Sequence, residues 1–259
     1  MNFNFHKYQG TGNDFIMIDD RAQFFPTLDQ AFIALCCHRR FGIGADGLIL
    51  VQPSDIADFK MVYFNSDGRE STLCGNGARC TVAFANALGI IKEATTFEAI
   101  DGLHTAQIKA NKDVALRMHD VKHIRNTNTY AFLDTGSPHH VEMVTDLATY
   151  PVVDQGAAIR YGDPYFQEGS NVNFVEQKTS NTFAIRTYER GVENETLSCG
   201  TGATAVAIAM HYKKMTTAQQ INILVEGGEL SVSFLPKENE YTAIDLMGPA
   251  QFVYSGKWK

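Results

Sequence analysis

The sequence predicts an α+β protein of two similar domains, each a β-sheet or barrel wrapped around one central helix. The main observation is an internal repeat at half the chain length. The segment Cys74–Arg79 (CGNGAR) recurs as Cys199–Thr204 (CGTGAT), 125 residues later in a chain of 259 residues. A unit repeated once at this period indicates two related domains and not a solenoid, whose repeats are short and numerous.

Further matches occur in the same order around these two segments. Tyr63, Glu70 and Ser71 match Tyr188, Glu195 and Thr196; Thr11-Gly12-Asn13 matches Thr135-Gly136-Ser137; Asp101-Gly102-Leu103 corresponds to Gly227-Gly228-Glu229-Leu230. Chance can supply one such coincidence but hardly four in one order. We therefore expect the two halves to fold alike.

Each copy has the same order of predicted elements. A β-rich stretch comes first, over 59–64 (FKMVYF) or 182–188 (TFAIRTY), and a polar loop and the Cys-Gly-x-Gly turn follow it. Helices are then expected over about 76–88 and 201–214. Their sequences, CTVAFANAL and ATAVAIAM, are small and apolar on almost every side, which is typical of a helix buried in the middle of a domain.

The remaining strands and the domain junction follow from shorter patterns. Alternating or apolar runs predict strands at 48–51, 106–109, 115–118, 171–175, 221–225 and 230–234. The polar, unpatterned segment His119–Thr129 is the expected junction between the domains. The closing segment Phe252–Tyr254 suits a strand of either domain.

Composition narrows the class of protein. Hydrophobic residues make up 44% and charged residues 20%, the formal net charge is −7, and there is no Lys/Arg run. Nucleic acid and anionic membrane are therefore not expected as partners, since both attract basic surfaces. The N-terminus has no apolar signal stretch, and no run approaches the roughly 20 apolar residues of a membrane helix, so we expect a cytoplasmic protein.

The five cysteines occupy positions 36, 37, 74, 80 and 199. Their odd number and the lack of a C-x-x-C spacing argue against a disulfide framework or a zinc site, so we expect reduced thiols and no metal. Cys36, Cys37 and Cys80 stand among apolar neighbours and are interpreted as packing residues. The segment Gly42–Gly47 matches G-x-G-x-x-G, but a helical stretch precedes it and a strand follows, the reverse of a dinucleotide site.

The two Cys-Gly-x-Gly turns carry the predicted chemistry. Unpaired N–H groups at a helix N-terminus attract an anion and favour the thiolate of a neighbouring cysteine. If the two domains face each other about a pseudo-twofold axis, Cys74 and Cys199 flank one cavity, and a carboxylate there receives N–H groups from both helices. A thiolate on one side then takes a Cα proton while a thiol on the other returns one, which inverts the centre. Such proton abstraction needs a closed, dry cavity, where preorganised donors act in a low dielectric.

Several motifs resemble those of diaminopimelate epimerases along the whole chain. They are Tyr8–Phe15 (YQGTGNDF), Phe64–Gly68 (FNSDG), Cys74–Cys80 (CGNGARC), Tyr188–Gly191 (YERG) and Cys199–Ala203 (CGTGA). The resemblance implies interconversion of LL- and meso-diaminopimelate for lysine and peptidoglycan synthesis, with no pyridoxal phosphate or other cofactor. It also implies a homodimer and the two-domain epimerase fold. We expect domains over 1–119, joined by the C-terminal strand at about 247–259, and over 120–246.

The resemblance also assigns roles to individual residues. It makes Cys74 and Cys199 the acid/base pair, and Gly75, Asn76, Gly200 and Thr201 the groups that hold the reacting carboxylate. The far end of the substrate falls to Asn13, Asn65, Asn173, Glu189 and Arg190, and the guanidinium suits a distal carboxylate. His139 and Glu189 match positions that tune the cysteines. Two positions depart from the family pattern, because many members have Gln at Gly47 and Asn at Ser137.

Three other functions are compatible with parts of this pattern. One is another two-cysteine racemase with the same fold, acting on proline, hydroxyproline or histidine; Arg190 and the asparagines favour a substrate with a second charged end. Another is a non-catalytic amino-acid-binding protein, which has no need for two thiols. The third is an isomerase with an acidic base in place of one cysteine, which the presence of both Cys74 and Cys199 disfavours.

Overall fold

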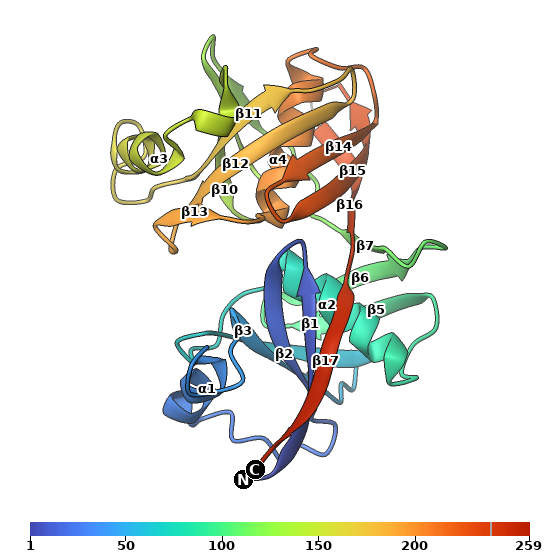
Figure 1. Ribbon diagram of the computed structural model, residues 1–259. Helices are drawn as coiled ribbons and strands as arrows, with labels where there is room; N and C mark the ends of the chain where they lie inside the picture. Colours follow the sequence, from blue (N-terminus) through green and yellow to red (C-terminus); the bar gives the residue numbers. More distant parts are fainter. Residues whose placement is uncertain (239) are drawn as a thin grey trace. The chain divides into compact units, whose positions relative to one another are not determined.

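The computed structural model describes residues 1–238 and 240–259. The chain divides into two compact units. Unit 1 contains Met1–Leu116 and Gly248–Lys259, and unit 2 contains Arg117–Met247. Figure 1 labels most of the helices and strands of both units. Within the described residues, no helix is long and apolar enough to cross a membrane.

Unit 1 is one run of hydrogen-bonded strands with two helices. Its strands are β1 (Phe3–Gly10), β2 (Asn13–Asp19), β3 (Gly47–Gln52), β4 (Phe59–Asn65), β5 (Ala94–Ala99), β6 (Gly102–Ile108), β7 (Val114–Arg117) and β17 (Gln251–Trp258), and its helices are α1 (Gln30–Cys37) and α2 (Gly75–Ala87). The C-terminal strand β17 pairs antiparallel with β1, so the two ends of the chain meet in this unit (Figure 1).

The buried side of unit 1 forms around α2 and one face of the sheet. Helix α2 contacts β1, β2, β3, β4 and β6, and its residues 76–82, 84 and 85 are buried. On the other side, α1 packs into a cluster that contains Ile16, Ile18, Leu48 and Leu50. The apolar run 47–51 of β3 is buried throughout, because it lies between the two helices. Burial on both faces is typical of a central strand in a helix-covered sheet.

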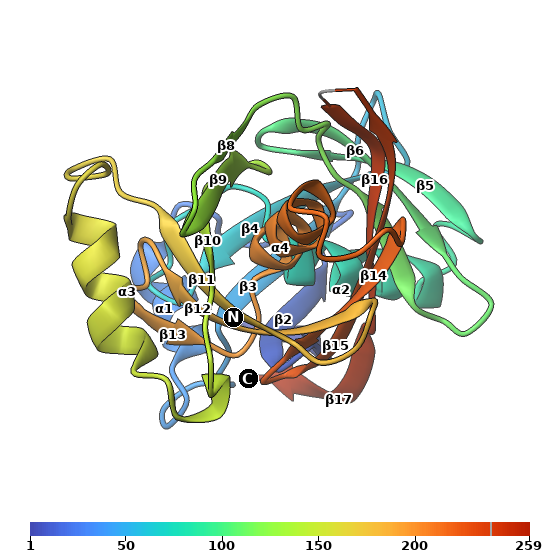
Figure 2. The same ribbon diagram turned by 90° about the horizontal axis from the view of Figure 1, so that it is seen from above.

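Unit 2 repeats this construction. Its strands are β8 (Ile124–Asn126), β9 (Tyr130–Asp134), β10 (Pro138–Met143), β11 (Asn171–Gln177), β12 (Thr182–Glu189), β13 (Asn194–Thr196), β14 (Gln220–Val225), β15 (Gly228–Lys237) and β16 (Glu240–Gly248). Its helices are η1 (Leu147–Thr149), α3 (Val152–Tyr161) and α4 (Gly200–Tyr212). Figure 2 shows α4 with β9–β12 on one side and β14–β16 on the other.

The order of strand pairings is the same in the two units. In unit 1, β1–β2 is antiparallel, β2–β3 parallel, β3–β4 antiparallel, β4–β5 parallel and β5–β6 antiparallel. In unit 2 the same sequence of directions runs through β9, β10, β11, β12, β14 and β15. Each cysteine-led helix follows the corresponding strand, β4 or β12. The repeat in the sequence is therefore a repeat of topology.

The predicted α+β class and the buried helices are confirmed. Gly200 and the nine successive residues 202–210 of α4 are buried, which agrees with its almost uniformly small and apolar sequence. The segment His119–Thr129, for which the sequence pattern predicted no helix or strand, contains a short strand. Residues 124–126 form β8, which pairs with β9, and Val121 bridges to Tyr241. These are backbone contacts of a short strand, and they leave no hydrophobic period in the sequence.

Candidate active site

Cys74 stands at the N-cap position of α2, in extended backbone geometry. The first intrahelical bond runs from the Ala78 amide to the Cys74 carbonyl, at 2.8 Å. The amides of Gly75, Asn76 and Gly77 precede that bond, so they are the group of N–H donors that a helix N-terminus offers to an anion. The cysteine side chain is half-buried, and its sulfur donates to Asn13 Oδ1 over 3.5 Å.

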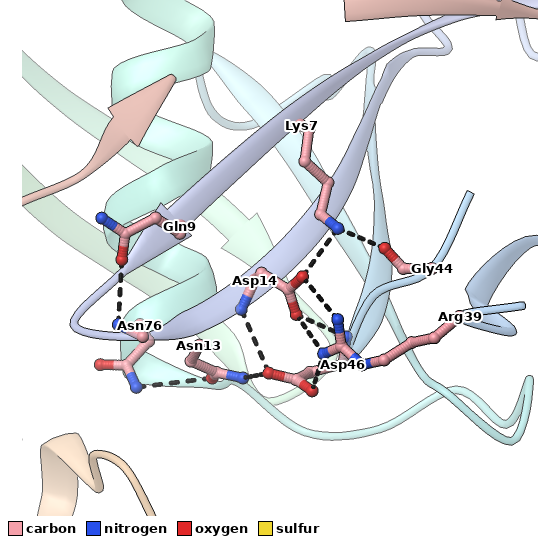
Figure 3. A network of polar contacts seen from close by, with 9 residues as sticks. Lys7, Gln9, Asn13, Asp14, Arg39, Gly44, Asp46 and Asn76 are labelled. Carbon is pink, nitrogen blue, oxygen red and sulfur yellow. Dashed lines mark hydrogen bonds and ion pairs between the residues drawn. The ribbon is translucent and has the colours of Figure 1, made fainter. Parts of the chain in front are cut away.

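A chain of hydrogen bonds fixes the polar side chains next to Cys74. Arg79, which is fully buried, donates from Nη2 to Asn76 Oδ1 at 2.8 Å. Asn76 Nδ2 donates in turn to Asn13 Oδ1 at 3.4 Å, and Asn13 Nδ2 donates to Asp46 Oδ2 at 2.6 Å (Figure 3). Burial lowers the pKa of Arg79. Because an arginine remains a donor in all ordinary conditions, it determines which way both amides face.

An ion-pair network supports Asp46 from behind (Figure 3). Asp14 accepts from Lys7 Nζ and from Arg39 Nη2, both at 2.7 Å, and Arg39 also contacts Asp46 Oδ1 at 2.7 Å. Burial alone raises the pKa of Asp14, but the bonds from Arg39 and Lys7 outweigh it and lower the pKa to about 2. The ammonium of Lys7 is itself buried and also donates to the Gly44 carbonyl.

Cys199 holds the equivalent N-cap position of α4 and is buried. Its sulfur lies 3.5 Å from the hydroxyl of Thr201, and that hydroxyl lies 2.9 Å from Nε2 of His139. His139 has no exposed surface, and burial, with a smaller effect of Arg190, lowers its pKa to about 3. The imidazole is therefore neutral at physiological pH.

Glu189 lies on the other side of Cys199, at the end of β12. Its carboxylate accepts from the Thr196 hydroxyl and from the Cys199 thiol. Burial raises the pKa of Glu189, although both of these bonds lower it. A carboxylate with a raised pKa next to a thiol is a group that exchanges a proton with it, which fits the predicted tuning role of Glu189.

Arg190 begins the turn after β12 and is exposed. Its Nη1 donates to the Glu168 carbonyl at 2.9 Å, and its backbone amide donates to Asn171 Oδ1 at 2.9 Å. Asn171 Nδ2 donates to the Ser137 hydroxyl at 2.8 Å. Asn171 therefore links Arg190 to Ser137, one of the two positions at which the chain departs from the family pattern. Asn171 was not among the site residues predicted from the sequence.

Asn173 lies two residues further along β11, and the structure gives it a different place from the one expected. It has no exposed surface. Its Nδ2 donates to His139 Nδ1 at 3.1 Å and to the His140 carbonyl at 2.9 Å, and its Oδ1 accepts from Thr187 at 3.0 Å. An amide whose groups are all used inside the unit supports neighbouring side chains and does not point at a substrate.

Gly47, the other position that departs from the family pattern, lies where neighbouring atoms leave little space for a side chain. Gly47 pairs with Asn65, whose side chain is exposed at the end of β4. A Cβ atom at position 47 would lie 2.6 Å from both the Phe64 carbonyl oxygen and the ring of Tyr63. The ring of Tyr63 therefore occupies the space that a side chain at position 47 needs.

Each unit thus presents one cysteine at a helix N-terminus, with hydrogen-bonded polar groups around the sulfur. Cys74 is grouped with Asn13 and Asn76, and Cys199 with Thr201, His139 and Glu189. Asn65 and Arg190 lie at the ends of β4 and β12, the equivalent strands. These arrangements combine a proton-exchanging group with donors for an anion.

Solved structures identify the class of fold. A PhzF-family phenazine biosynthesis protein from Bacillus anthracis matches with a TM-score of 0.78, 16% sequence identity and coverage of 100% of this chain and 99% of that one. A hydroxyproline epimerase from Agrobacterium vitis matches with a TM-score of 0.69, 14% identity and coverage of 99% and 92%. The protein has the two-domain fold that these proteins share.

Sequence comparison identifies the family. The model of the diaminopimelate epimerase family matches residues 5–124 and 131–253. Diaminopimelate epimerase from Flavobacterium psychrophilum is 57% identical over 249 residues, covering 96% of this chain and 97% of the relative. The Chlorobaculum tepidum enzyme of the same name is 41% identical, with coverage of 95% and 98%. The chain belongs to the diaminopimelate epimerase family, as its motifs predicted.

Proposed function

We propose that the protein is an isomerase that interconverts LL- and meso-2,6-diaminopimelate, using Cys74 and Cys199 as the two acid/base groups and no cofactor. The observation that carries this proposal is the equivalence of the two cysteines. Each is the N-cap residue of the helix that follows the corresponding strand of a duplicated fold. A duplicated binding scaffold has no need for a thiol at both places, whereas a two-base reaction requires both.

The proposed reaction is balanced without an outside proton carrier. The thiolate of one cysteine takes the Cα proton, so one C–H bond breaks and one S–H bond forms. The thiol of the other cysteine protonates the opposite face of Cα, so its S–H bond breaks and a new C–H bond forms. The negative charge has then moved from one sulfur to the other, and the substrate has inverted. The reverse reaction starts from the state that the forward reaction leaves.

The carboxylate next to the reacting carbon is assigned to the amides that begin α2 and α4. The groups are those of Gly75, Asn76, Gly200 and Thr201. An exposed helix N-terminus stabilises an anion by only about 0.3–1 kcal/mol, but such donors are several times more effective where water is excluded. The proposed mechanism therefore includes closure of both units around the substrate.

The distal end of the substrate is assigned to Arg190, with Asn13, Asn65 and Glu189. The exposed guanidinium of Arg190 donates to the Glu168 carbonyl, and the backbone amide of Arg190 donates to Asn171 Oδ1. A guanidinium binds a carboxylate bidentately. This favours a substrate with two charged ends over proline, hydroxyproline or histidine.

We also propose a homodimer in a reducing cytoplasm. Strand β17 presents Phe252, Val253 and Tyr254 with exposed fractions of 53%, 54% and 42%. Consecutive exposed apolar residues on one strand are typical of an interface. The proposed chemistry requires reduced thiols at Cys74 and Cys199, which a cytoplasmic protein keeps.

The test is incubation of LL-diaminopimelate with the purified protein in D₂O, with a reductant and without pyridoxal phosphate. We expect deuterium at Cα together with the meso product. Cys74→Ala and Cys199→Ala are each expected to abolish epimerisation with the fold retained, as measured by circular dichroism. Substantial turnover by either variant would contradict the two-thiol reaction. Exchange with proline or histidine in place of diaminopimelate would move the assignment to another racemase, and no exchange at all would favour a binding protein.

A further inference from the structure

Unit 2 has a buried polar cluster at positions where unit 1 has hydrocarbon. Phe15 of β2 and His139 of β10 lie 124 residues apart, the displacement that relates Thr11-Gly12-Asn13 to Thr135-Gly136-Ser137, so they are equivalent. The same displacement relates Ile49 of β3 to Asn173 of β11, so these two residues are also equivalent. The positions that Phe15 and Ile49 fill with hydrocarbon in unit 1 are therefore filled in unit 2 by the imidazole of His139 and the amide of Asn173.

Both pairs lie under the first turn of the cysteine-led helix. A Cβ atom on Gly77 of α2 would lie 3.0 Å from Ile49 and 3.4 Å from Phe15. A Cβ atom on Gly202, the equivalent residue of α4, would lie 2.4 Å from Asn173 Oδ1. All four side chains are fully buried. Unit 1 shows that the fold accepts hydrocarbon at this place, and burying polar groups instead costs free energy unless they are bonded. The polar cluster of unit 2 therefore has a role besides packing.

The direction of each hydrogen bond in the cluster is determined, beginning at Asn173. The His140 carbonyl accepts only, so the Asn173 atom 2.9 Å from it is the NH₂ group. That group has a second hydrogen, which points at His139 Nδ1 over 3.1 Å. His139 Nδ1 must therefore be an acceptor. The remaining amide atom, Oδ1, accepts from the Thr187 hydroxyl at 3.0 Å.

The acceptor at Nδ1 determines the rest of the chain. A neutral imidazole with an unprotonated Nδ1 has its hydrogen on Nε2. Nε2 lies 2.9 Å from Thr201 Oγ1 and donates to it, so the threonine oxygen is the acceptor of that bond. The hydroxyl hydrogen of Thr201 is then available for the sulfur of Cys199, which lies 3.5 Å away.

We propose that Asn173 is a positioning residue, which holds His139 in the Nε2–H tautomer and thereby directs the Thr201 hydroxyl to donate to Cys199 Sγ. This inference rests on the proposed function, since it deepens the role of Cys199 in that reaction. A hydroxyl that donates to sulfur stabilises the thiolate and not the thiol. In unit 1 the arrangement is the opposite, because Cys74 faces the carbonyl oxygen of Asn13, an acceptor.

One charged group contacts the same sulfur, and two further residues act on its neighbours; all three enter the expected pH dependence of Cys199. Within unit 2, Glu189 of β12 accepts from the Cys199 thiol, and burial raises its pKa. Arg190 faces His139 and helps to keep the imidazole neutral, since its charge lowers the pKa of that group further. Thr196 of β13 donates its hydroxyl hydrogen to Glu189. The Thr201 variants below leave these three residues unchanged.

The first experiment measures the thiolate of Cys199 directly. The full-length protein is alkylated with iodoacetamide across a pH series, and the rate at Cys199 is followed by peptide mass spectrometry. Removal of the hydroxyl takes a hydrogen bond away from the thiolate, so Thr201→Val is expected to move the Cys199 profile upward by about one pH unit. Thr201→Ser keeps the hydroxyl and should retain the wild-type profile. An unchanged profile in Thr201→Val would overturn the proposal.

The second experiment reads the tautomer of His139. In protein labelled with ¹⁵N-histidine, we expect His139 to be neutral with its hydrogen on Nε2 throughout the active pH range. Asn173→Leu, which replaces the amide with the hydrocarbon type found in unit 1, should lose the single tautomer and shift the alkylation profile upward. Thr187→Val removes only the bond to Asn173 Oδ1, so it should lower stability without moving the profile. A wild-type His139 with its hydrogen on Nδ1 would refute the proposal.

Both measurements are independent of turnover. If the protein did not epimerise diaminopimelate, the alkylation profile and the tautomer could still be measured. That result would contradict the proposed function and leave the role of Asn173 open to its own test. If Asn173→Leu does not fold, the wild-type tautomer and the Thr201 pair still decide the matter.

Discussion

Asp46 determines which atom of the Asn13 side-chain amide, the oxygen or the nitrogen, points at the Cys74 sulfur. Its Oδ2 accepts from Asn13 Nδ2 at 2.6 Å (Figure 3). This leaves Asn13 Oδ1 directed at the Cys74 sulfur, 3.5 Å away. The buried Arg79 imposes the same orientation from the opposite side through Asn76. A carboxylate outside the immediate surroundings of the sulfur therefore controls what the sulfur faces.

Asp46→Ala is expected to lower kcat/KM for diaminopimelate about tenfold, the effect of roughly one hydrogen bond, since Asn13 loses the acceptor that orients it. Arg39→Met is the control, because it removes the ion pairs with Asp14 and Asp46 but leaves the bond from Asn13 to Asp46 in place. That variant should keep most of the activity. Steady-state kinetics of the two purified variants makes the comparison, and equal losses in both would show that the ion-pair network as a whole, and not the Asn13 orientation, matters.

The pKa of Asp14 predicts how stability responds to acid. In the folded protein this pKa is lowered to about 2 from an ordinary value of 3.8, because the bonds from Arg39 and Lys7 outweigh the effect of burial. A lowered pKa gives stability that is fully present above the unfolded-state value and is lost as pH falls through the folded-state value. We expect a loss of about 1–2 kcal/mol between about pH 4 and 2, allowing for solvent screening.

Urea unfolding of the wild type and of Asp14→Asn from pH 7 to 2 measures this contribution. The variant lacks the titrating carboxylate, so the difference between the two proteins should be largest at neutral pH and should shrink in acid. A difference that stays constant across the series would assign the stability to something other than this ionisation.

The sequence was sufficient to predict the parts of the fold that repeat. Cys74 and Cys199 recur in one motif, and the helices after them are apolar on nearly every side, so both the duplication and the burial could be inferred from composition and spacing. The same reasoning missed β8, since a three-residue strand held by backbone bonds leaves no period in the sequence.

Asn171 and Asn173 show more clearly what the sequence could not predict, namely which of two neighbouring asparagines lies next to Arg190. The two residues lie on the same face of β11, because side chains two residues apart in a strand point the same way. Only the register and the position of α4 distinguish them. Asn173 lies under the helix and has no exposed surface, whereas Asn171 reaches the backbone of Arg190 and the hydroxyl of Ser137. A sequence pattern of alternating asparagines contains no such distinction.

Arg190→Ala tests the assignment of the distal carboxylate. We expect KM for diaminopimelate to rise about tenfold or more, the equivalent of one charge-assisted bond, with a much smaller effect on binding of a monocarboxylic amino acid. Arg186→Gln is a matched control in β12, the strand that directly precedes Arg190, because Arg186 is bound to Glu195 and to backbone carbonyls of 147 and 150. It should lower stability and leave KM unchanged. Equal effects of Arg190→Ala on both kinds of ligand would remove the distal role.

The two departures from the family pattern are expected to differ in their tolerance of the family residue. In Gly47→Gln, the new Cβ atom would meet the Phe64 carbonyl oxygen and the Tyr63 ring at 2.6 Å, and the carbonyl belongs to the backbone of a paired strand. Such overpacking costs about 1–3 kcal/mol, so the melting temperature should fall by several degrees. Ser137→Asn changes a partly exposed residue and should be nearly neutral. Thermal unfolding of both variants decides the point, and a Gly47→Gln protein as stable as the wild type would mean that the Tyr63 ring moves aside without cost.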